Sequence, residues 1–187
     1  MRIVGGKFAG RHLTSPADAR VRPTAEPVRA ALLDLLAEDL PNARVLDLFA
    51  GTGALGLEAI SRGARQCDFV EFRPGSLHAL RANVGALRLK ERTRIFNRDA
   101  IPFAAALDEG AYDLAFADPP YESKVLDRVL EIWRERRFAP VLAVEHARGH
   151  QLAGRGTRRN FGDTAVTIYR LAGRGPRTEA RAKEATS

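Results

Sequence analysis

Short apolar runs alternate with longer segments of helical periodicity over most of the chain. The runs are rich in β-branched and aromatic residues, as in buried strands, and they cover residues 45–49, 67–71, 93–97, 113–117 and 141–145. The segments between them repeat apolar side chains every three or four positions and predict helices over residues 55–62, 75–87, 102–107 and 124–136. This alternation is typical of an α/β fold, a parallel sheet with helices on both faces.

The pattern changes at both ends of the chain. Residues 156–161 and 165–171 are strand-like with no helix between them, so they predict a closing antiparallel hairpin and a Rossmann-like sheet of about seven strands. Residues 2–4 and 11–13 predict a small hairpin, and Thr24 is a candidate cap for a helix with Pro27 in its first turn. We therefore divide the chain into an amino-terminal extension (1–42), a main domain (43–172) and a polar, basic tail expected to be disordered (173–187).

Charge is concentrated at the two ends of this 187-residue chain. The formal net charge is +7; residues 1–30 carry +4, residues 147–187 carry +6, and the middle is slightly acidic. Basic ends favour a polyanionic partner such as a nucleic acid, although 26 of the 30 basic residues are Arg, which genome base bias also produces. Cys67 is the only cysteine and no apolar stretch reaches about 20 residues, so we expect a cytoplasmic protein without a metal, most simply a monomer.

A glycine-rich loop follows the first strand of the main domain. Gly51, Gly53 and Gly56 form a G-x-G-x-x-G pattern between strand and helix, and Glu71 lies twenty residues after the first glycine. A dinucleotide-binding oxidoreductase is one interpretation. However, Asp47 precedes the loop within the strand, where its carboxylate would repel a pyrophosphate and attract an ammonium or sulfonium group. The loop is therefore predicted to approach a cationic ligand.

S-adenosylmethionine has these cationic groups. Glu71 could accept hydrogen bonds from both ribose hydroxyls, and Asp99 with the N–H of Ala100 could read an adenine edge. Each acid taken singly could equally be a solvated strand-end residue. Taken together, the candidate cofactor-binding residues are Asp47, Phe49, Gly51, Thr52, Gly53, Glu71, Phe72, Asp99 and Ala100.

A polar and aromatic turn follows the fourth strand. Asp118, Pro119, Pro120 and Tyr121 combine a carboxylate, a turn rigidified by two prolines and an aromatic ring. The Asp118 carboxylate and the Pro119 carbonyl could accept hydrogen bonds from an exocyclic amine while Tyr121 stacks on its base. An ordinary strand-to-loop exit would use the same residue types. We take the four residues as the candidate catalytic site.

The motifs resemble those of the class I S-adenosylmethionine-dependent methyltransferases, and in particular the bacterial 16S ribosomal RNA guanine-N2 methyltransferase family. The resemblance rests on residues 46–62, the Val70–Glu71 pair and residues 118–121, together with amino-terminal glycines and an Arg-Pro-Thr element at 22–24. It departs from the family at residues 25–27, between that element and Val28, and in the Arg-rich hairpin after residue 150.

This resemblance implies methylation of the exocyclic amine of one guanine in small-subunit rRNA, free or in an assembling particle. Asp47, Gly51, Gly53, Glu71 and Asp99 would hold the cofactor, and Asp118, Pro119 and Tyr121 the base. The candidate RNA contacts lie in the extension, with Arg158 and Arg159 as further candidates; they are Arg2, Lys7, Arg11, Arg22, Thr24 and Arg29.

Three alternatives stay open at this point. A methyltransferase could act on another planar nitrogen, such as adenine N6, cytosine N4 or a glutamine side chain. A nicotinamide-dependent oxidoreductase would use the same glycine loop, although Asp47 disfavours it. A non-catalytic RNA-binding module would not need acids at all four of positions 47, 71, 99 and 118.

Overall fold

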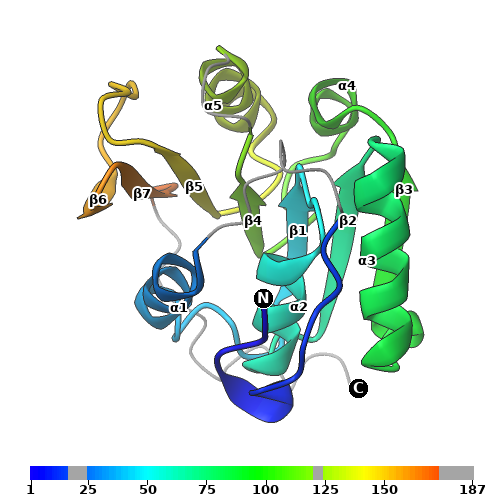
Figure 1. The fold of residues 1–187 in the computed structure, drawn as a ribbon. Coiled ribbons are helices and arrows are strands. Elements are labelled where there is room, and N and C mark those ends of the chain that lie inside the picture. Colours follow the sequence, from blue (N-terminus) through cyan, green and yellow to red (C-terminus); the bar gives the residue numbers. More distant parts are fainter. Residues whose placement is uncertain (17–24, 120–123, 173–187) are drawn as a thin grey trace, which may run out of the picture.

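Seven strands form a single sheet in the computed structural model, which describes residues 1–16, 25–119 and 124–172 (Figure 1). Their order across the sheet is β3-β2-β1-β4-β5-β7-β6. The first five run parallel, and β7 pairs antiparallel with both β5 and β6. The predicted architecture is thus confirmed. The strands are β1 (Arg44–Leu48), β2 (Gln66–Glu71), β3 (Thr93–Asn97), β4 (Leu114–Ala117), β5 (Val141–Ala147), β6 (Thr157–Phe161) and β7 (Thr164–Arg170).

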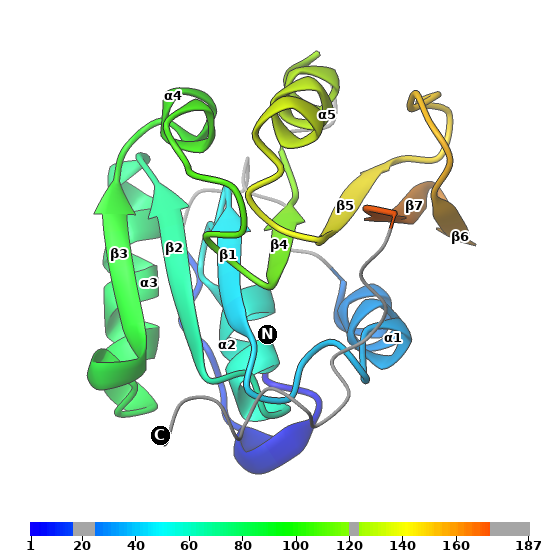
Figure 2. The same cartoon turned by 180° about the vertical axis from the view of Figure 1, so that it is seen from behind.

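Helices cover both faces of the sheet, as predicted. One face carries α1, α2 and α3, and the other carries α4 and α5 (Figures 1 and 2). A separate cluster of buried apolar side chains fills each interface. None of the helices in the described part of the chain is long and apolar enough to span a bilayer. The helices are α1 (Glu26–Leu35), α2 (Ala54–Ser61), α3 (Pro74–Ala86), α4 (Ala100–Ala105) and α5 (Val125–Arg136), with 3-10 turns η1 (Gly6–Phe8) and η2 (Lys90–Arg92).

The strand register brings the carboxyl ends of the parallel strands to one edge. In the pairing, Leu48 lies opposite both Val70 of β2 and Ala117 of β4, and Ala117 lies opposite Val144 of β5. The segments after β1, β2 and β4 therefore leave the sheet side by side. Ligands of open parallel sheets bind beyond this edge.

The amino-terminal extension packs on the main domain. Its predicted hairpin is reduced to one bridge, Arg2 to His12, around η1, and Ile3 and Leu13 join the core under α1 and α2. Helix α1 has a proline in its first turn, as predicted. Its N-cap position is occupied by Ala25, which makes no side-chain capping hydrogen bond, and the predicted cap Thr24 lies outside the described residues.

Some predicted residues lie outside the described ranges. These are Arg22 and Thr24 of the extension, Pro120 and Tyr121 of the turn after β4, and the tail from residue 173. Their roles stay predictions.

Candidate active site

The glycine loop leaves β1 through residues in the left-handed region of backbone space. Gly51 and Gly53 have φ values of +55° and +78°. A Cβ built on Gly53 would lie 2.3 Å from Leu80 Cδ1, whereas one on Gly51 would meet no atom closer than 4.0 Å. Gly53 is therefore required both for its conformation and for helix packing. Gly51 is required for its conformation alone, and the space above it is open.

Phe49 enters the loop with a φ of +64°. This conformation is uncommon for a bulky side chain and costs about 1–3 kcal/mol. Strained backbone of this kind concentrates at functional sites. Phe49 is half-buried at the end of β1, at the edge where a ligand is expected.

Asp47 lies beneath the loop. Only 2% of the residue is exposed, and its Oδ2 accepts a hydrogen bond of 3.0 Å from the N–H of Gly56. Burial raises the pKa of Asp47 to about 7; the Gly56 N–H opposes this shift, and the charge of Glu71 adds to it. The carboxylate thus holds the start of α2 against β1. Direct contact between Asp47 and a ligand stays a prediction.

Glu71 ties the end of β2 to the glycine loop. Its carboxylate accepts hydrogen bonds from the N–H groups of Gly51 at 2.9 Å, Phe72 at 2.8 Å and Arg73 at 2.8 Å. A carboxylate has about four acceptor positions, so it can also accept from a ligand hydroxyl. The next residue, Phe72, is 52% exposed, with the Arg73 guanidinium 6.0 Å from its ring centroid. Its ring is available for stacking beside Glu71.

Asp99 and Ala100 begin α4 at the same edge. The Asp99 carboxylate caps the helix by accepting from the N–H of Ile101 at 2.8 Å, which is why α4 starts two residues before the predicted helix. A hollow of about 430 Å³ adjoins Asp99, a volume within the usual range for ligand pockets. It is lined by Arg98, Asp99, Pro102, Phe103, Ala106 and Leu107.

Asp118 and Pro119 leave β4 next to the glycine loop. Because Ala117 pairs with Leu48, Asp118 and Phe49 are the first residues after the paired ends of two adjacent strands. Asp118 is half-buried and Pro119 is buried. The structure therefore brings the two halves of the predicted site together.

Glu145 is a further acid at this edge, which the sequence analysis did not select. The pairing of Ala117 with Val144 puts Glu145 of β5 at the position beside Asp118, and 4% of the residue is exposed. An acid at the end of the last parallel strand was the available signal. In the sequence, a single acid at this position cannot be distinguished from an ordinary solvated strand-end residue.

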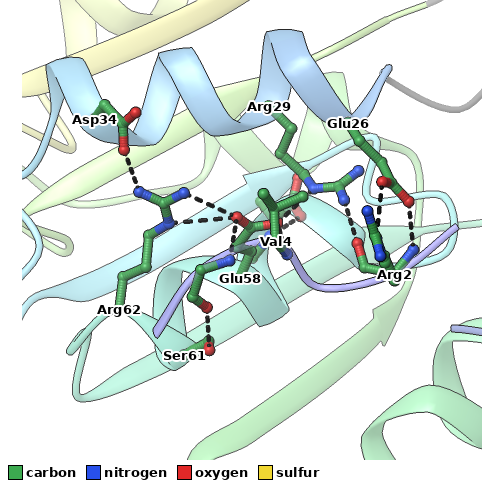
Figure 3. Close-up of polar contacts among 11 residues, drawn as sticks. Arg2, Val4, Glu26, Arg29, Asp34, Glu58, Ser61 and Arg62 are labelled. Atoms are coloured by element: carbon green, nitrogen blue, oxygen red, sulfur yellow. Dashed lines mark hydrogen bonds and ion pairs between the residues drawn. The ribbon is translucent and has the colours of Figure 1, made fainter. Parts of the chain in front are cut away.

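Arg29 is not an RNA contact, contrary to the prediction. Its side chain is fully buried, and its Nε donates to Glu58 Oε2 at 2.7 Å (Figure 3). The same guanidinium donates to the backbone carbonyl of Arg2. The sequence places Arg29 on a basic stretch and gives no sign that it points inward.

Glu58 of α2 is the centre of the cluster around Arg29. Besides Arg29, its carboxylate accepts from the N–H groups of Val4 and Gly5 at 3.2 Å each, and from Arg62 Nη2 at 3.1 Å. Arg62 in turn pairs with Asp34 of α1 (Figure 3). We call Arg29, Asp34, Glu58 and Arg62 the Glu58 cluster. It fastens the extension and α1 to the helix that follows the glycine loop.

The other described RNA candidates do not form one patch. The Arg2 side chain pairs with Glu26, and Arg11 donates to the carbonyl of Ala86 at the end of α3. Lys7 lies in η1, which packs on the carboxyl end of α2 and so faces away from the edge of the glycine loop (Figure 1). The Arg158 guanidinium is engaged by backbone carbonyls of the preceding loop.

Comparison with known proteins identifies the family of the chain. A family model described as "Conserved hypothetical protein 95" matches residues 1–170. The Bacillus subtilis protein "Putative rRNA methyltransferase YlbH" is 30% identical over 92% of this chain and 100% of its own length. "Ribosomal RNA small subunit methyltransferase D" of Escherichia coli K12 is 35% identical over 71% of this chain and 66% of its own length.

A solved structure identifies the fold. "Putative methyltransferase yhhF from Escherichia coli" superimposes with a TM-score of 0.78 and 29% identity, covering 91% of this chain and 97% of that one. The resemblance noted in the sequence is thereby confirmed. The chain has the class I methyltransferase fold and belongs to the Conserved hypothetical protein 95 family.

Proposed function

We propose that the protein transfers a methyl group from S-adenosylmethionine to the exocyclic N2 amine of a guanine in 16S ribosomal RNA. The observation that carries this proposal is the position of Asp118 and Pro119 beside the glycine loop, set by the pairing of Ala117 with Leu48. An amine held by the turn after β4 would face a methyl donor held by the loop after β1. The names of the relatives, which refer to rRNA, support the substrate class.

The residues at the edge fit S-adenosylmethionine. Glu71 is held in place by three backbone donors and keeps acceptor capacity for the ribose, and Phe72 offers an exposed ring for the adenine. A cation near Asp47 would favour its ionised form against the burial that raises its pKa to about 7. When bound, the cofactor supplies an electrophilic methyl group on a sulfonium.

The transfer proceeds directly in line. With S-adenosylmethionine bound, the amine nitrogen would accept the methyl group, and the electron pair of the broken carbon–sulfur bond would leave with the neutral thioether. Asp118 and the Pro119 carbonyl orient the amine by accepting from its N–H groups and offset its growing positive charge. The nitrogen then loses one proton, for which Asp118 is the candidate acceptor.

The base must leave its stack to enter this site. Unstacking costs a few kcal/mol, and stacking on an aromatic side chain returns about 1–3 kcal/mol. Tyr121 is the predicted stacking partner, although it lies outside the described residues.

The test is the Asp118→Ala variant. We expect it to bind S-adenosylhomocysteine with unchanged affinity and to lose at least about a hundredfold in methylation rate, because the amine is no longer oriented. Asp108→Asn, at an exposed position between α4 and β4, is the matched control. A wild-type rate in Asp118→Ala would disprove the mechanism.

The substrate is tested separately. Labelled S-adenosylmethionine is incubated with unmodified small-subunit particles, naked 16S rRNA, tRNA and DNA, and the label is mapped to its nucleotide. Label on guanine N2 in 16S rRNA is expected. Label on adenine N6 or cytosine N4 would keep the chemistry and overturn the substrate, and thermal stabilisation by NAD instead of S-adenosylhomocysteine would overturn both.

A further inference from the structure

The buried side chain of Asn83 bridges the amino-terminal extension and the glycine loop. Asn83 lies on α3 and is 1% exposed. Its Oδ1 accepts from the N–H of Thr14 at 2.7 Å, and its Nδ2 donates to the carbonyls of Thr14 at 3.0 Å and Thr52 at 2.9 Å. Both amide hydrogens are thus used, one on each side of the bridge.

The two ends of the bridge belong to different parts of the proposed site. Thr52 is the middle residue of the Gly51–Gly53 turn, where the cofactor is expected. Thr14 follows Arg11, a candidate RNA contact held on the carbonyl of Ala86. The segment then reaches the start of α3, because a Cβ on Gly75 would lie 3.7 Å from Pro16 Cβ.

We propose that Asn83 is a positioning residue that couples cofactor binding at the glycine loop to RNA binding by the amino-terminal extension. This inference rests on the proposed function, since it assigns the two ligands to the two ends of the bridge. A buried amide that loses one partner leaves a polar group unsatisfied. A shift of the glycine loop is therefore expected to shift the segment around Thr14 with it. S-adenosylmethionine and RNA then each favour the arrangement of the two segments to which the other ligand binds.

The coupling is measured as a ratio of affinities. The dissociation constant of in vitro transcribed 16S rRNA is determined with and without saturating S-adenosylhomocysteine, at one fixed salt concentration. We expect the cofactor product to tighten RNA binding of the wild-type protein about tenfold, within the 5–150-fold range of allosteric couplings. By linkage, RNA must tighten S-adenosylhomocysteine binding by the same factor.

Two substitutions at position 83 break the bridge. Asn83→Asp keeps the acceptor for the Thr14 N–H but turns a carboxylate oxygen towards the carbonyls of Thr14 and Thr52. Asn83→Ala removes all three hydrogen bonds. In both variants, S-adenosylhomocysteine is expected to tighten RNA binding by less than about twofold. Val84→Ala, at the next and equally buried position of α3, is the control for lost stability, and its ratio should stay at the wild-type value.

The outcomes separate the inference from the proposed function. If wild-type protein binds RNA and S-adenosylhomocysteine independently, or if Asn83 variants keep the tenfold ratio, the coupling is refuted while the methyltransferase proposal stands. If wild-type protein binds neither this rRNA nor unmodified small-subunit particles, the proposed function fails as well. Should neither Asn83 variant fold, Thr14→Pro removes one N–H from the other side of the bridge, and an unchanged ratio there would refute the coupling.

Discussion

Glu58→Gln is expected to destabilise the protein strongly without touching the proposed site. Arg29 and Glu58 form a 2.7 Å ion pair with both side chains fully buried, and Arg62, 17% exposed, approaches the same carboxylate. Gln keeps the shape but turns an amide donor towards one of the guanidinium groups and leaves a buried cation uncompensated. Removing one partner of a buried pair costs about 3–5 kcal/mol.

That loss is large against a total stability of about 5–15 kcal/mol. For a chain of this size it lowers Tm by about 6–20 °C, measured by circular dichroism and by urea unfolding. Glu131→Gln on α5 is the control, because its pair with Arg128 has side chains 61% and 58% exposed and contributes about 0–1 kcal/mol. A Glu58→Gln loss within about 1 kcal/mol of the control would refute the assigned role of the Glu58 cluster.

Four further predictions concern the residues around the glycine loop and the amino-terminal extension. Burial raises the pKa of Asp47 from its ordinary value of 3.8 to about 7, so between about pH 4 and 7 the folded protein holds a proton that the unfolded chain has lost. The free energy of unfolding should therefore fall by up to about 1.4 kcal/mol per pH unit as pH rises through this range. Urea unfolding should show that Asp47→Asn removes this fall. Gly56→Ala should destabilise the protein by about 1–3 kcal/mol, because the added Cβ would lie 2.5 Å from Cys67 Sγ. Gly85→Ala is the contrast in the same assay. Its Cβ would point into open space on α3, so it should stabilise the protein by up to about 1 kcal/mol. Phe72→Ala should weaken S-adenosylhomocysteine binding about tenfold in calorimetry without lowering Tm, and an unchanged affinity would exclude stacking on this ring. Arg11→Ala should reduce the slope of log affinity against log salt for RNA by about 0.7–0.9, and an identical slope would remove Arg11 from the RNA contacts.

The strands and helices of the main domain were predictable because burial repeats along the sequence. Strand β1 reads as an apolar run since both of its faces are covered, and the glycines after it mark a turn that other residues cannot adopt. The amino-terminal hairpin was less predictable. Its two pieces pair through one bridge only, and they are fixed by contacts with α2 that lie more than fifty residues away.

The polar contacts of the site were harder to predict than its elements. A sequence shows that Arg29 is charged but not that Glu58, one helix later, lies where it can be paired. Asn83 has the same difficulty, since an amide in an amphipathic helix gives no sign of two backbone partners from distant segments. Acids at strand ends were easier, because the end of a parallel strand identifies the edge on which they meet.

The hairpin of β6 and β7 has a consequence for how copies of the protein meet. Strand β6 forms one margin of the sheet, so one side of its backbone has no neighbouring strand within the described chain. Such a margin invites another chain to add a strand and start aggregation. Arg158 and Arg159 lie on it with their side chains on opposite faces, and Arg94, paired with Asp68, lies on β3 at the opposite margin. Charged side chains at the margins of a sheet disfavour its edge-to-edge growth.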